Sequence, residues 1–305
     1  MTARPGDGCR PRRNRGPGRE RPARRLPALL DGHRPRKRFS QSFLVEPGVA
    51  RRIVDLCCIQ AGETVIEVGP GMGALTGFLL ERAARVHAVE LDRNLAERLG
   101  VQYASEPRFC LHAADILDIR IRDLVPEGRV VVVGNLPYAI TSDLVLWLLE
   151  QHDAVRRAVV LMQREVAVRL TAQPGERAAG SLTLAVRYRA EAERLLDVAP
   201  GSFHPVPKVT SSLVSFRFLS EPAVRPRDEA FFFRVIRAAY GERRKTFVNA
   251  VSTGLGISHA QVEHAVRDLG LDGRVRGERL GLDEFRRLAD LLGGAIPGTR
   301  PENGD

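Results

Sequence analysis

Apolar and polar residues follow a regular order of helix-like and strand-like segments between residues 48 and 163. Some segments repeat apolar residues every three or four positions, and the segments between them are short apolar runs rich in valine. We predict helices at 48–60, 73–84, 94–105 and 142–152, and strands at 64–69, 85–92, 108–116, 129–135 and 157–163. This alternation is typical of an α/β fold, in which a parallel sheet carries helices on both faces.

The pattern changes near residue 180. A helical segment at 180–190 precedes two extended segments at 192–199 and 209–218, and a proline-rich stretch, PGSFHPVPK, lies between these two. After EPAVRPRDE, which we predict to be a linker, we predict three helical segments at 230–252, 260–270 and 282–292. The sequence therefore predicts a larger domain over residues 39–219 and a small helical domain over residues 220–305.

The positive charge of the chain is concentrated at its beginning. The formal net charge is +10, and residues 1–38 hold thirteen Arg and Lys against three acidic residues, so the rest of the chain is neutral. The segment is also rich in Pro and Gly and has little to bury, which predicts a disordered basic tail. It could be an RNA-attracting arm, an organellar transit peptide or an inert start.

Other features limit the class of protein. Cys9, Cys57, Cys58 and Cys110 do not have the spacing of metal ligands, so we expect no metal site. No apolar run approaches the roughly 20 residues that a membrane-spanning helix requires. The tail also has no apolar core like that of a signal peptide. We expect a cytoplasmic protein with no membrane contact.

A glycine-rich turn, EVGPGMGALT, stands where the first predicted strand meets its helix. Gly69, Gly71 and Gly73 let a ligand approach the backbone closely at the carboxyl edge of the sheet. The next strand ends at Glu90, whose carboxylate can accept hydrogen bonds from both hydroxyls of a ribose. These two features predict a cofactor that contains a nucleoside.

Three interpretations of the glycine turn remain. The glycines could serve the turn alone, or they could bind a dinucleotide or S-adenosylmethionine (SAM). The G-x-G-x-G spacing lacks the third glycine of the dinucleotide motif, and Glu67 places an acid where a pyrophosphate is unwelcome. An acid at that position suits a cationic cofactor, which favours SAM.

Asp115 follows the third strand and reaches the same edge of the sheet. It could accept a hydrogen bond from an adenine amino group, or it could cap the next helix.

The stretch NLPY ends the fourth strand at the same edge. The Asn135 side-chain oxygen and the Leu136 carbonyl could each accept a hydrogen bond from an adenine amino group, which would direct the nitrogen lone pair at a methyl donor. Pro137 stiffens the turn, and Tyr138 could stack on the base. The alternative is an ordinary Asn-Pro turn. Taken with the glycine turn and Glu90, the stretch predicts methyl transfer to an adenine.

Two residues of the proline-rich stretch could take part. Phe203 could close the other side of the slot, because a flipped base needs aromatic surfaces, or it could be a loop anchor in the core. Lys208 could meet a phosphate or be simply solvated.

The sequence resembles the ribosomal RNA adenine N6-dimethyltransferases, which include the KsgA-type small-subunit enzymes and the Erm-type macrolide-resistance enzymes. The likeness runs from about Lys37 to Leu292 and is carried by KRFSQSFL, VIEVGPGMGALT, VELD, AADI, VVGNLPYAIT, SFHPVPKV and GERRKTFVNA. It implies a Rossmann-like class I SAM-dependent methyltransferase domain over residues 39–219, followed by a small helical RNA-binding domain. Ser42 and Ala139 depart from the usual asparagines of the family at these positions.

The resemblance also implies a set of functional residues. Together with the glycine turn, the cofactor contacts expected are Gln41, Ser42, Leu44, Gly69, Gly71, Glu90, Asp115 and Asn135. The residues expected to act on the base are Asn135, Leu136, Pro137, Tyr138 and Phe203. Those expected to contact RNA are Lys208, Arg243, Arg244 and Lys245.

The second domain looks KsgA-type. The expected function is therefore N6-dimethylation of two adjacent adenines in a 3′-terminal hairpin of 16S rRNA, with a role in small-subunit biogenesis, by a chain that we expect to be monomeric. An Erm-type 23S rRNA enzyme, a non-catalytic RNA-binding assembly or transcription factor and a nicotinamide dehydrogenase are the alternatives.

Overall fold

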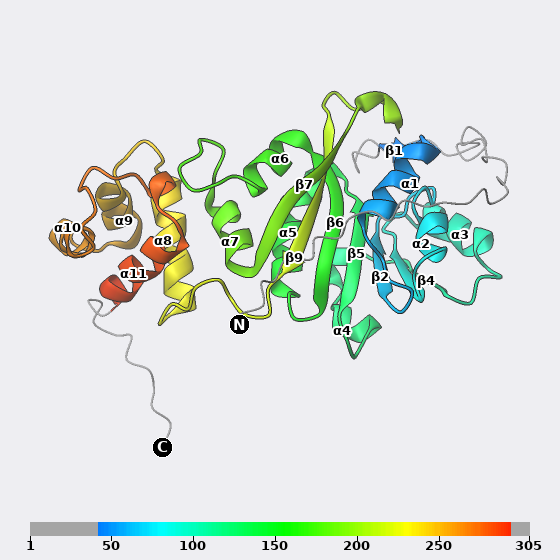
Figure 1. Cartoon of the computed structure of the whole chain (residues 1–305), viewed down its shortest axis with the longest axis horizontal. Helices are drawn as coiled ribbons and strands as arrows, with labels where there is room; N and C mark the ends of the chain where they lie inside the picture. The colour runs from blue at the N-terminus through cyan, green and yellow to red at the C-terminus, as the bar shows by residue number, and fades with distance from the viewer. Residues whose placement is uncertain (1–41, 294–305) are drawn as a thin grey trace, which may run out of the picture. The chain divides into compact units, whose positions relative to one another are not determined.

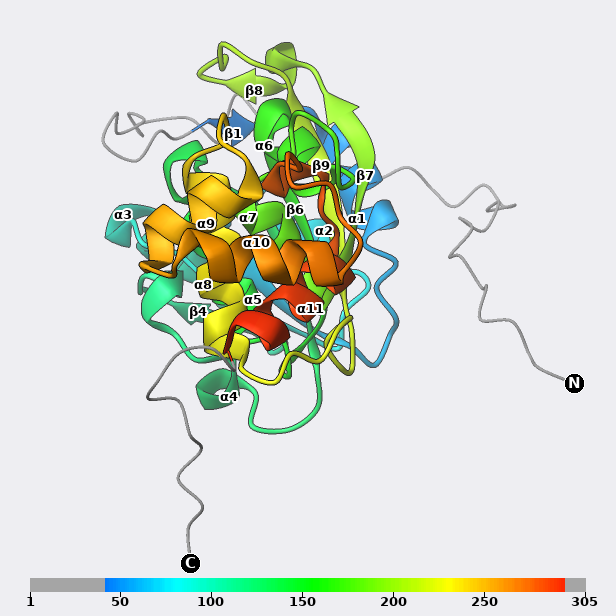
Figure 2. The same ribbon diagram turned by 90° about the vertical axis from the view of Figure 1, so that its left-hand side faces the viewer.

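The computed structural model describes residues 42–293, so the predicted tail and Gln41 lie outside the described residues. The described chain divides into two compact units (Figures 1 and 2). The first unit contains residues 42–164 and 193–217, and the second contains residues 165–192 and 218–293.

The first unit is built on the predicted α/β sheet. Its seven strands lie in the order β4-β3-β2-β5-β6-β9-β7, and the five from β4 to β6 are parallel, which confirms the predicted fold class. Strand β9 runs antiparallel to β6. The strands are β2 (Thr64–Val68), β3 (Arg85–Val89), β4 (Phe109–His112), β5 (Val130–Asn135), β6 (Val155–Gln163), β7 (Ala190–Val198) and β9 (Ser211–Phe218).

Helices cover both faces of this sheet. On one face, Val65, Val131 and Val159 pack in a buried cluster with residues of α1 (Pro47–Leu56) and α2 (Thr76–Leu80). The other helices of this unit are α3 (Arg93–Gln102), α4 (Ile121–Leu124) and α5 (Thr141–Glu150). From β2 the chain moves outward to β3 and β4, whereas from β5 it moves the other way to β6. Right-handed crossovers then place α5 on the face opposite to α2 and α3.

The reversal of strand order between β2 and β5 positions the functional site. In open α/β sheets, ligands bind beyond the carboxyl ends of the strands where the order reverses. The glycine turn follows β2, and Asn135 is the last residue of β5. The fold therefore brings these two motifs to the same edge.

Helix α2 is shorter than the predicted helix at 73–84. Its first residue is Thr76, because Gly73 has a φ of +78°, a left-handed conformation that an α-helix cannot contain. The glycine turn therefore extends three residues further than the sequence pattern indicates, to Leu75.

A small second sheet lies beside the main one. Strand β1 (Phe43–Leu44) pairs antiparallel with β8 (Phe203–His204), and Leu44 faces Phe203 in the register. The pairing fixes the segment just after Gln41 against the proline-rich stretch.

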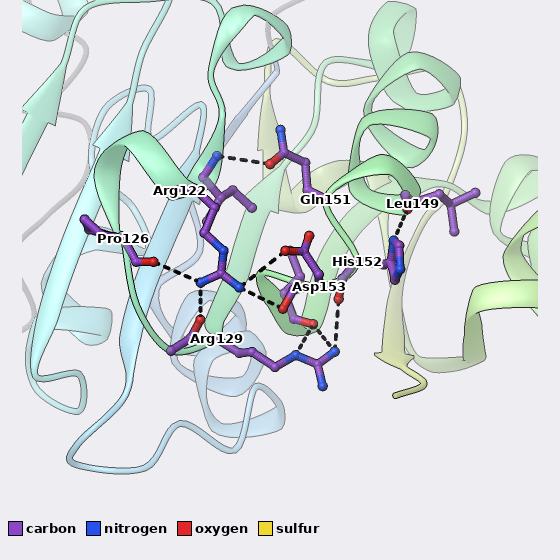
Figure 3. Close-up of polar contacts among 10 residues, drawn as sticks. Arg122, Pro126, Arg129, Leu149, Gln151, His152 and Asp153 are labelled. Carbon is purple, nitrogen blue, oxygen red and sulfur yellow. Dashed lines mark hydrogen bonds and ion pairs between the residues drawn. The ribbon is translucent and has the colours of Figure 1, made fainter. Parts of the chain in front are cut away.

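Arginine side chains fasten the amino ends of β5 and β6 (Figure 3). Arg129 donates to the carbonyls of His152 and Val155, and Arg122 donates to the carbonyls of Gly128 and Asp153. Each guanidinium satisfies several backbone acceptors at once, so these contacts stabilise the end of the sheet opposite to the functional edge.

The second unit is helical. Its helices are α6 (Arg164–Leu170), α7 (Ser181–Arg189), α8 (Glu229–Gly241), α9 (Phe247–Leu255), α10 (His259–Asp268) and α11 (Leu282–Gly293). The prediction of one helix over 230–252 is wrong, because α8 ends at Gly241 and a separate helix, α9, begins at Phe247. Thr246 caps the new helix, since its hydroxyl accepts a hydrogen bond from the N–H of Asn249 at 3.3 Å.

The division of the chain differs from the predicted one in one segment. Residues 165–192 group with the C-terminal helices, whereas the prediction assigned them to the larger domain. Packing explains the difference: Leu184 and Tyr188 of α7 belong to the same buried cluster as Phe232 of α8. The Tyr188 hydroxyl also donates to Glu229 at 2.7 Å.

Two histidines are in contact on adjacent strands of the sheet. The Nδ1 atom of His87 on β3 lies 3.1 Å from the Nε2 atom of His112 on β4, and the two rings are stacked. Burial, reinforced by His112 and Arg85, lowers the pKa of His87 to about 4. The folded protein therefore keeps His87 neutral at pH values where an unfolded chain would protonate it.

Because the pKa of His87 is lowered in the folded protein, we expect the protein to lose stability in mild acid. An unfolded histidine has a pKa near 6.5, so between about pH 6.5 and 4 the unfolded chain gains a proton that the folded chain excludes. The stabilisation is present above pH 6.5 and is lost as the pH falls. Urea unfolding followed by circular dichroism should show a smaller pH dependence over this range for His87→Gln than for the wild type. The matched change at exposed His259, His259→Gln, should leave the dependence unaltered.

Candidate active site

An open cavity of about 720 Å³, which includes the space that opens to solvent, lies at the predicted edge of the sheet. Residues from the ends of three parallel strands contribute to it: Glu67 from β2, Glu90 after β3 and Asn135 from β5. Its lining comprises Ser42, Phe43, Leu44, Glu67, Gly69, Pro70, Gly71, Met72, Ala74, Leu75, Glu90, Leu95, Asn135, Leu136, Pro137 and Tyr138. All of these residues belong to the first unit.

The glycine turn brings backbone to the cavity. Gly69 has a φ of +62° and Gly71 a φ of +58°, values that residues with a side chain rarely adopt. A Cβ atom on Gly71 would lie 3.0 Å from the ring of Phe43, so glycine lets that ring lie against the turn. Phe43 packs with Met72 and Leu95 and gives the cavity an apolar wall.

Glu90 is held by the turn that it faces. One carboxylate oxygen accepts a hydrogen bond from the N–H of Gly71 and the other from the N–H of Asp92, each at 2.9 Å. Burial raises the pKa of Glu90, while these two N–H groups act in the opposite direction. Each oxygen keeps a further lone pair, so the carboxylate can still accept hydrogen bonds from two hydroxyl groups of a ligand.

Glu67 is fully buried beside this wall. Burial raises its pKa to about 8, although the hydroxyl of Thr76 donates to it at 2.7 Å. Burial therefore favours the neutral carboxyl at neutral pH when no positive charge is near it. A positive charge brought into the cavity would favour the ionised form.

The tip of β5 is set by a close approach of two strands. A Cβ atom on Gly134 would lie 2.8 Å from the Val68 carbonyl oxygen, so glycine is required for β5 to lie against β2 here. The Nδ2 atom of Asn135 then donates to the carbonyl of Ser42 at 3.0 Å. Because a carbonyl can only accept, the amide NH₂ must face Ser42 and Oδ1 is left to accept from a ligand.

The rest of NLPY forms a short turn on the cavity wall. The N–H of Leu136 donates to the Leu161 carbonyl at 3.1 Å, which ties the turn to β6. Tyr138 begins a 3₁₀ turn, η4 (Tyr138–Ile140), and its hydroxyl lies 2.9 Å from the Oγ atom of Ser211. Ala139 is exposed, and the contact from Ser42 uses its backbone, so neither departure from the usual asparagine alters these contacts.

Three predicted site residues lie elsewhere in the first unit. Asp115 caps the 3₁₀ turn η3 (Ile116–Asp118) by accepting from the N–H of Leu117 at 3.0 Å, and it is not part of the cavity lining. Phe203 is only 2% exposed and packs in the core with Leu44, so the expectation that it faces the slot is wrong for this arrangement. Lys208 is exposed in the loop before β9.

The structure also places residues at the site that the sequence did not single out. Phe43, Met72 and Leu95 line the cavity, but apolar residues in such segments are equally typical of the core. Gly134 had a usable signal, since a glycine inside a run of buried valines marks a close approach of backbone.

The predicted RNA-contacting residues of the second unit lie between α8 and α9. Arg243 donates to the Arg177 carbonyl at 2.6 Å and pairs with Glu278 at 3.3 Å, and Lys245 pairs with Glu242. Arg244 is exposed, and no ion pair to it occurs within residues 42–293.

Comparison with known proteins assigns the chain to a family. The sequence model of the family described as "Ribosomal RNA adenine dimethylase" matches residues 32–290. The chain belongs to this family. It is therefore an rRNA adenine methyltransferase that uses SAM as the methyl donor.

Relatives match this dimethylase over nearly their whole length. A "Ribosomal RNA small subunit methyltransferase A" of Aromatoleum aromaticum is 40% identical over 88% of this chain and 98% of its own. Proteins of the same name from Geobacter metallireducens and Pseudomonas aeruginosa are 41% and 39% identical, over 86% and 88% of this chain and 97% and 98% of their own.

Solved structures agree with the fold. The dimethylase resembles the 23S rRNA methyltransferase ErmE with a TM-score of 0.66 and 26% identity, over 82% of this chain and 99% of that one. A dimethyladenosine transferase from Plasmodium falciparum shares the fold with a TM-score of 0.68 and 21% identity, over 82% and 98% of the two chains.

The cavity of the dimethylase fits SAM. Glu90 offers acceptors for a ribose, the wall of Phe43, Met72 and Leu95 suits a flat base, and Glu67 can ionise beside a cation. SAM supplies an electrophilic methyl group when bound. No group of three or more side chains suited to holding a metal ion occurs within the described part of the chain, and none of its helices is long and apolar enough to cross a membrane.

Proposed function

We propose that the dimethylase modifies small-subunit rRNA and places two methyl groups on N6 of each of two adjacent adenines in a 3′-terminal hairpin of 16S rRNA. The observation that carries this proposal is the likeness to proteins named small-subunit methyltransferase A, at about 40% identity over 97–98% of their length. The enzyme would then act in the cytoplasm as a monomer during small-subunit biogenesis.

The chemistry rests on the acceptors at the tip of β5. The Oδ1 atom of Asn135 and the Leu136 carbonyl would accept from the two N6 protons and draw the nitrogen toward a tetrahedral geometry. Its lone pair, otherwise delocalised into the purine ring, would then point at the methyl group. The amino proton becomes acidic once the methyl group has moved, so solvent can remove it and no strong base is needed.

Cofactor binding rests on the glycine turn and the acid after β3. Gly69, Gly71 and Glu90 would hold the nucleoside part of SAM, with Ser42 and Leu44 bounding the cavity. A contact from Asp115 to the adenine remains a prediction of its place at the end of the third strand, and one from Gln41, outside the described residues, remains a prediction of the resemblance.

RNA binding would involve the basic residues of both units. Lys208 and Arg244 are exposed, whereas Arg243 and Lys245 already have acidic partners. Phosphate contacts of this kind carry no sequence information, but they orient the substrate and weaken as salt concentration rises.

Methylation mapping tests this target. Primer extension and mass spectrometry of rRNA from cells lacking the chain should show the loss of two adjacent dimethyladenines in 16S rRNA, and purified enzyme should restore them on 30S particles. The methylation of 23S rRNA from the same cells should not change, and it serves as the internal control.

One alternative has an observation in its favour. The likeness to ErmE, at 26% identity and a TM-score of 0.66, favours an enzyme acting on 23S rRNA. In that case the missing methyl groups would lie in 23S rRNA and the 16S hairpin would be unchanged.

A further inference from the structure

The hydroxyl of Tyr138 is anchored by a strand that the sequence pattern did not connect with the site. Its oxygen lies 2.9 Å from the Oγ atom of Ser211, a residue 73 positions further along the chain. Ser211 is 1% exposed and does not line the cavity. Ser211 therefore contacts Tyr138, a residue of the cavity wall, from the side that faces the protein core.

The antiparallel direction of β9 explains this placement. Ser211 is the first residue of β9 and pairs with Gln163, the last residue of β6. The amino end of an antiparallel strand lies at the carboxyl end of its neighbour, so β9 begins at the functional edge of the sheet. The Arg164 N–H donates to the Thr210 carbonyl at 3.0 Å, which fixes the backbone just before Ser211.

A tyrosine ring needs such an anchor to hold one orientation. Tyrosine has several staggered χ1 rotamers, each of which points the ring in a different direction, so rotamer preference alone does not keep Tyr138 on the cavity wall. The hydroxyl oxygen lies on the axis of the ring, so a hydrogen bond to it fixes the direction in which the ring points and keeps Tyr138 in one rotamer. Across the turn, the Ser42 carbonyl holds the Asn135 amide. The two ends of NLPY are thus fixed by two different segments of the chain.

We propose that Ser211 is a positioning residue for methyl transfer: its hydroxyl fixes the Tyr138 ring so that one face is presented to the target adenine. The inference rests on the proposed role of Tyr138 as a stacking surface. Ser211 itself does not touch the substrate and acts through Tyr138.

The neighbouring residue provides a matched control. Ser212 is 0% exposed, lies on the same strand and donates to Asp197. Successive side chains of a strand point to opposite faces, so the Ser212 hydroxyl lies on the other face of β9. Ser212→Ala removes an equally buried hydroxyl without touching Tyr138.

Steady-state kinetics on the full chain test the proposal. Ser211→Ala should lower kcat about tenfold, with SAM affinity by calorimetry within about twofold of the wild type, because one hydrogen bond behind the ring is lost. Ser211→Thr keeps the hydroxyl and should restore kcat, and Ser212→Ala should leave it unchanged. Tyr138→Phe should lose as much as Ser211→Ala, and the double variant should lose no more than either.

A spectroscopic readout separates this proposal from the proposed function. The surroundings of the Tyr138 ring can be followed by fluorine NMR of protein that contains 3-fluorotyrosine, with the signal assigned by its loss in Tyr138→Phe. Ser211→Ala should shift and broaden this signal, because the ring then samples other χ1 rotamers, and Ser212→Ala should leave it unchanged. The proposal would be overturned by a wild-type kcat in Ser211→Ala, by losses that multiply in the double variant, or by an unchanged Tyr138 signal in Ser211→Ala. Absence of 16S rRNA methylation by the wild type would instead reject only the proposed target, since the NMR comparison needs no substrate.

Discussion

Replacing Asn135 with alanine is expected to lower the rate of methyl transfer about a thousandfold, with a much smaller loss of SAM affinity and with the fold intact. The change removes the acceptor that holds one N6 proton, and loss of one such preorganised group costs about 10²–10³ in kcat. The alanine side chain fits the strand tip, because within the described chain the Asn135 amide forms a hydrogen bond only with the Ser42 carbonyl. A single-turnover assay with saturating SAM measures the rate.

Asn135→Asp separates the two functions of the amide. The carboxylate keeps an acceptor for the adenine, but it has no donor for the Ser42 carbonyl and would bring two oxygens together. We expect an activity between those of the wild type and the alanine variant. Thermal unfolding and SAM calorimetry on both variants serve as controls, and full activity of Asn135→Ala would reject the acceptor mechanism.

Glu90→Ala is expected to weaken SAM binding by about a hundredfold or more. Two hydrogen bonds to a charged acceptor contribute about 1.5–3 kcal/mol each, and either alone accounts for a tenfold change. The substitution also leaves the N–H groups of Gly71 and Asp92 without their acceptor, which loosens the glycine turn. Isothermal titration calorimetry with SAM measures the effect directly.

Two further variants calibrate the Glu90 result. Glu90→Gln keeps the shape but loses the charge and one acceptor, so its affinity should lie between those of the wild type and the alanine variant. Glu97→Ala removes an exposed acid from the adjacent helix α3 and should bind SAM as the wild type does. An affinity of Glu90→Ala within threefold of the wild type would contradict the assignment of Glu90 to the cofactor site.

The sequence pattern predicted the sheet well because its central strands β2 and β5 are short buried runs. Val130–Val133 are fully buried, and a run of this kind leaves few alternatives to an interior strand. Positions set by backbone geometry were predicted less well. The shortened α2 depends on the left-handed Gly73, and the break after Gly241 depends on the cap at Thr246. Local residue preferences do not reveal either feature reliably.

The candidate site divides in the same way. Glu90 and Asn135 could be found because polar residues at the ends of apolar strands meet at one edge. Ser211 could not, because its place depends on the antiparallel direction of β9, which nothing in its own residues records. Phe203 was misplaced for a related reason: the pairing of β1 with β8 takes its ring into the core. The grouping of residues 165–192 with the C-terminal helices likewise depends on long-range packing.

The two anchors of the NLPY turn also set an order for maturation of the enzyme. One partner, Ser42, lies 93 positions before Asn135, and the other, Ser211, lies 73 positions after Tyr138. Contacts between residues so far apart in sequence form late, because long loops must close first. The cavity wall formed by Phe43 and Leu44 likewise depends on strand β8, which is made about 160 residues later. On the translating ribosome the cofactor cavity and the turn that accepts the adenine can therefore be completed only near the end of synthesis of the first unit.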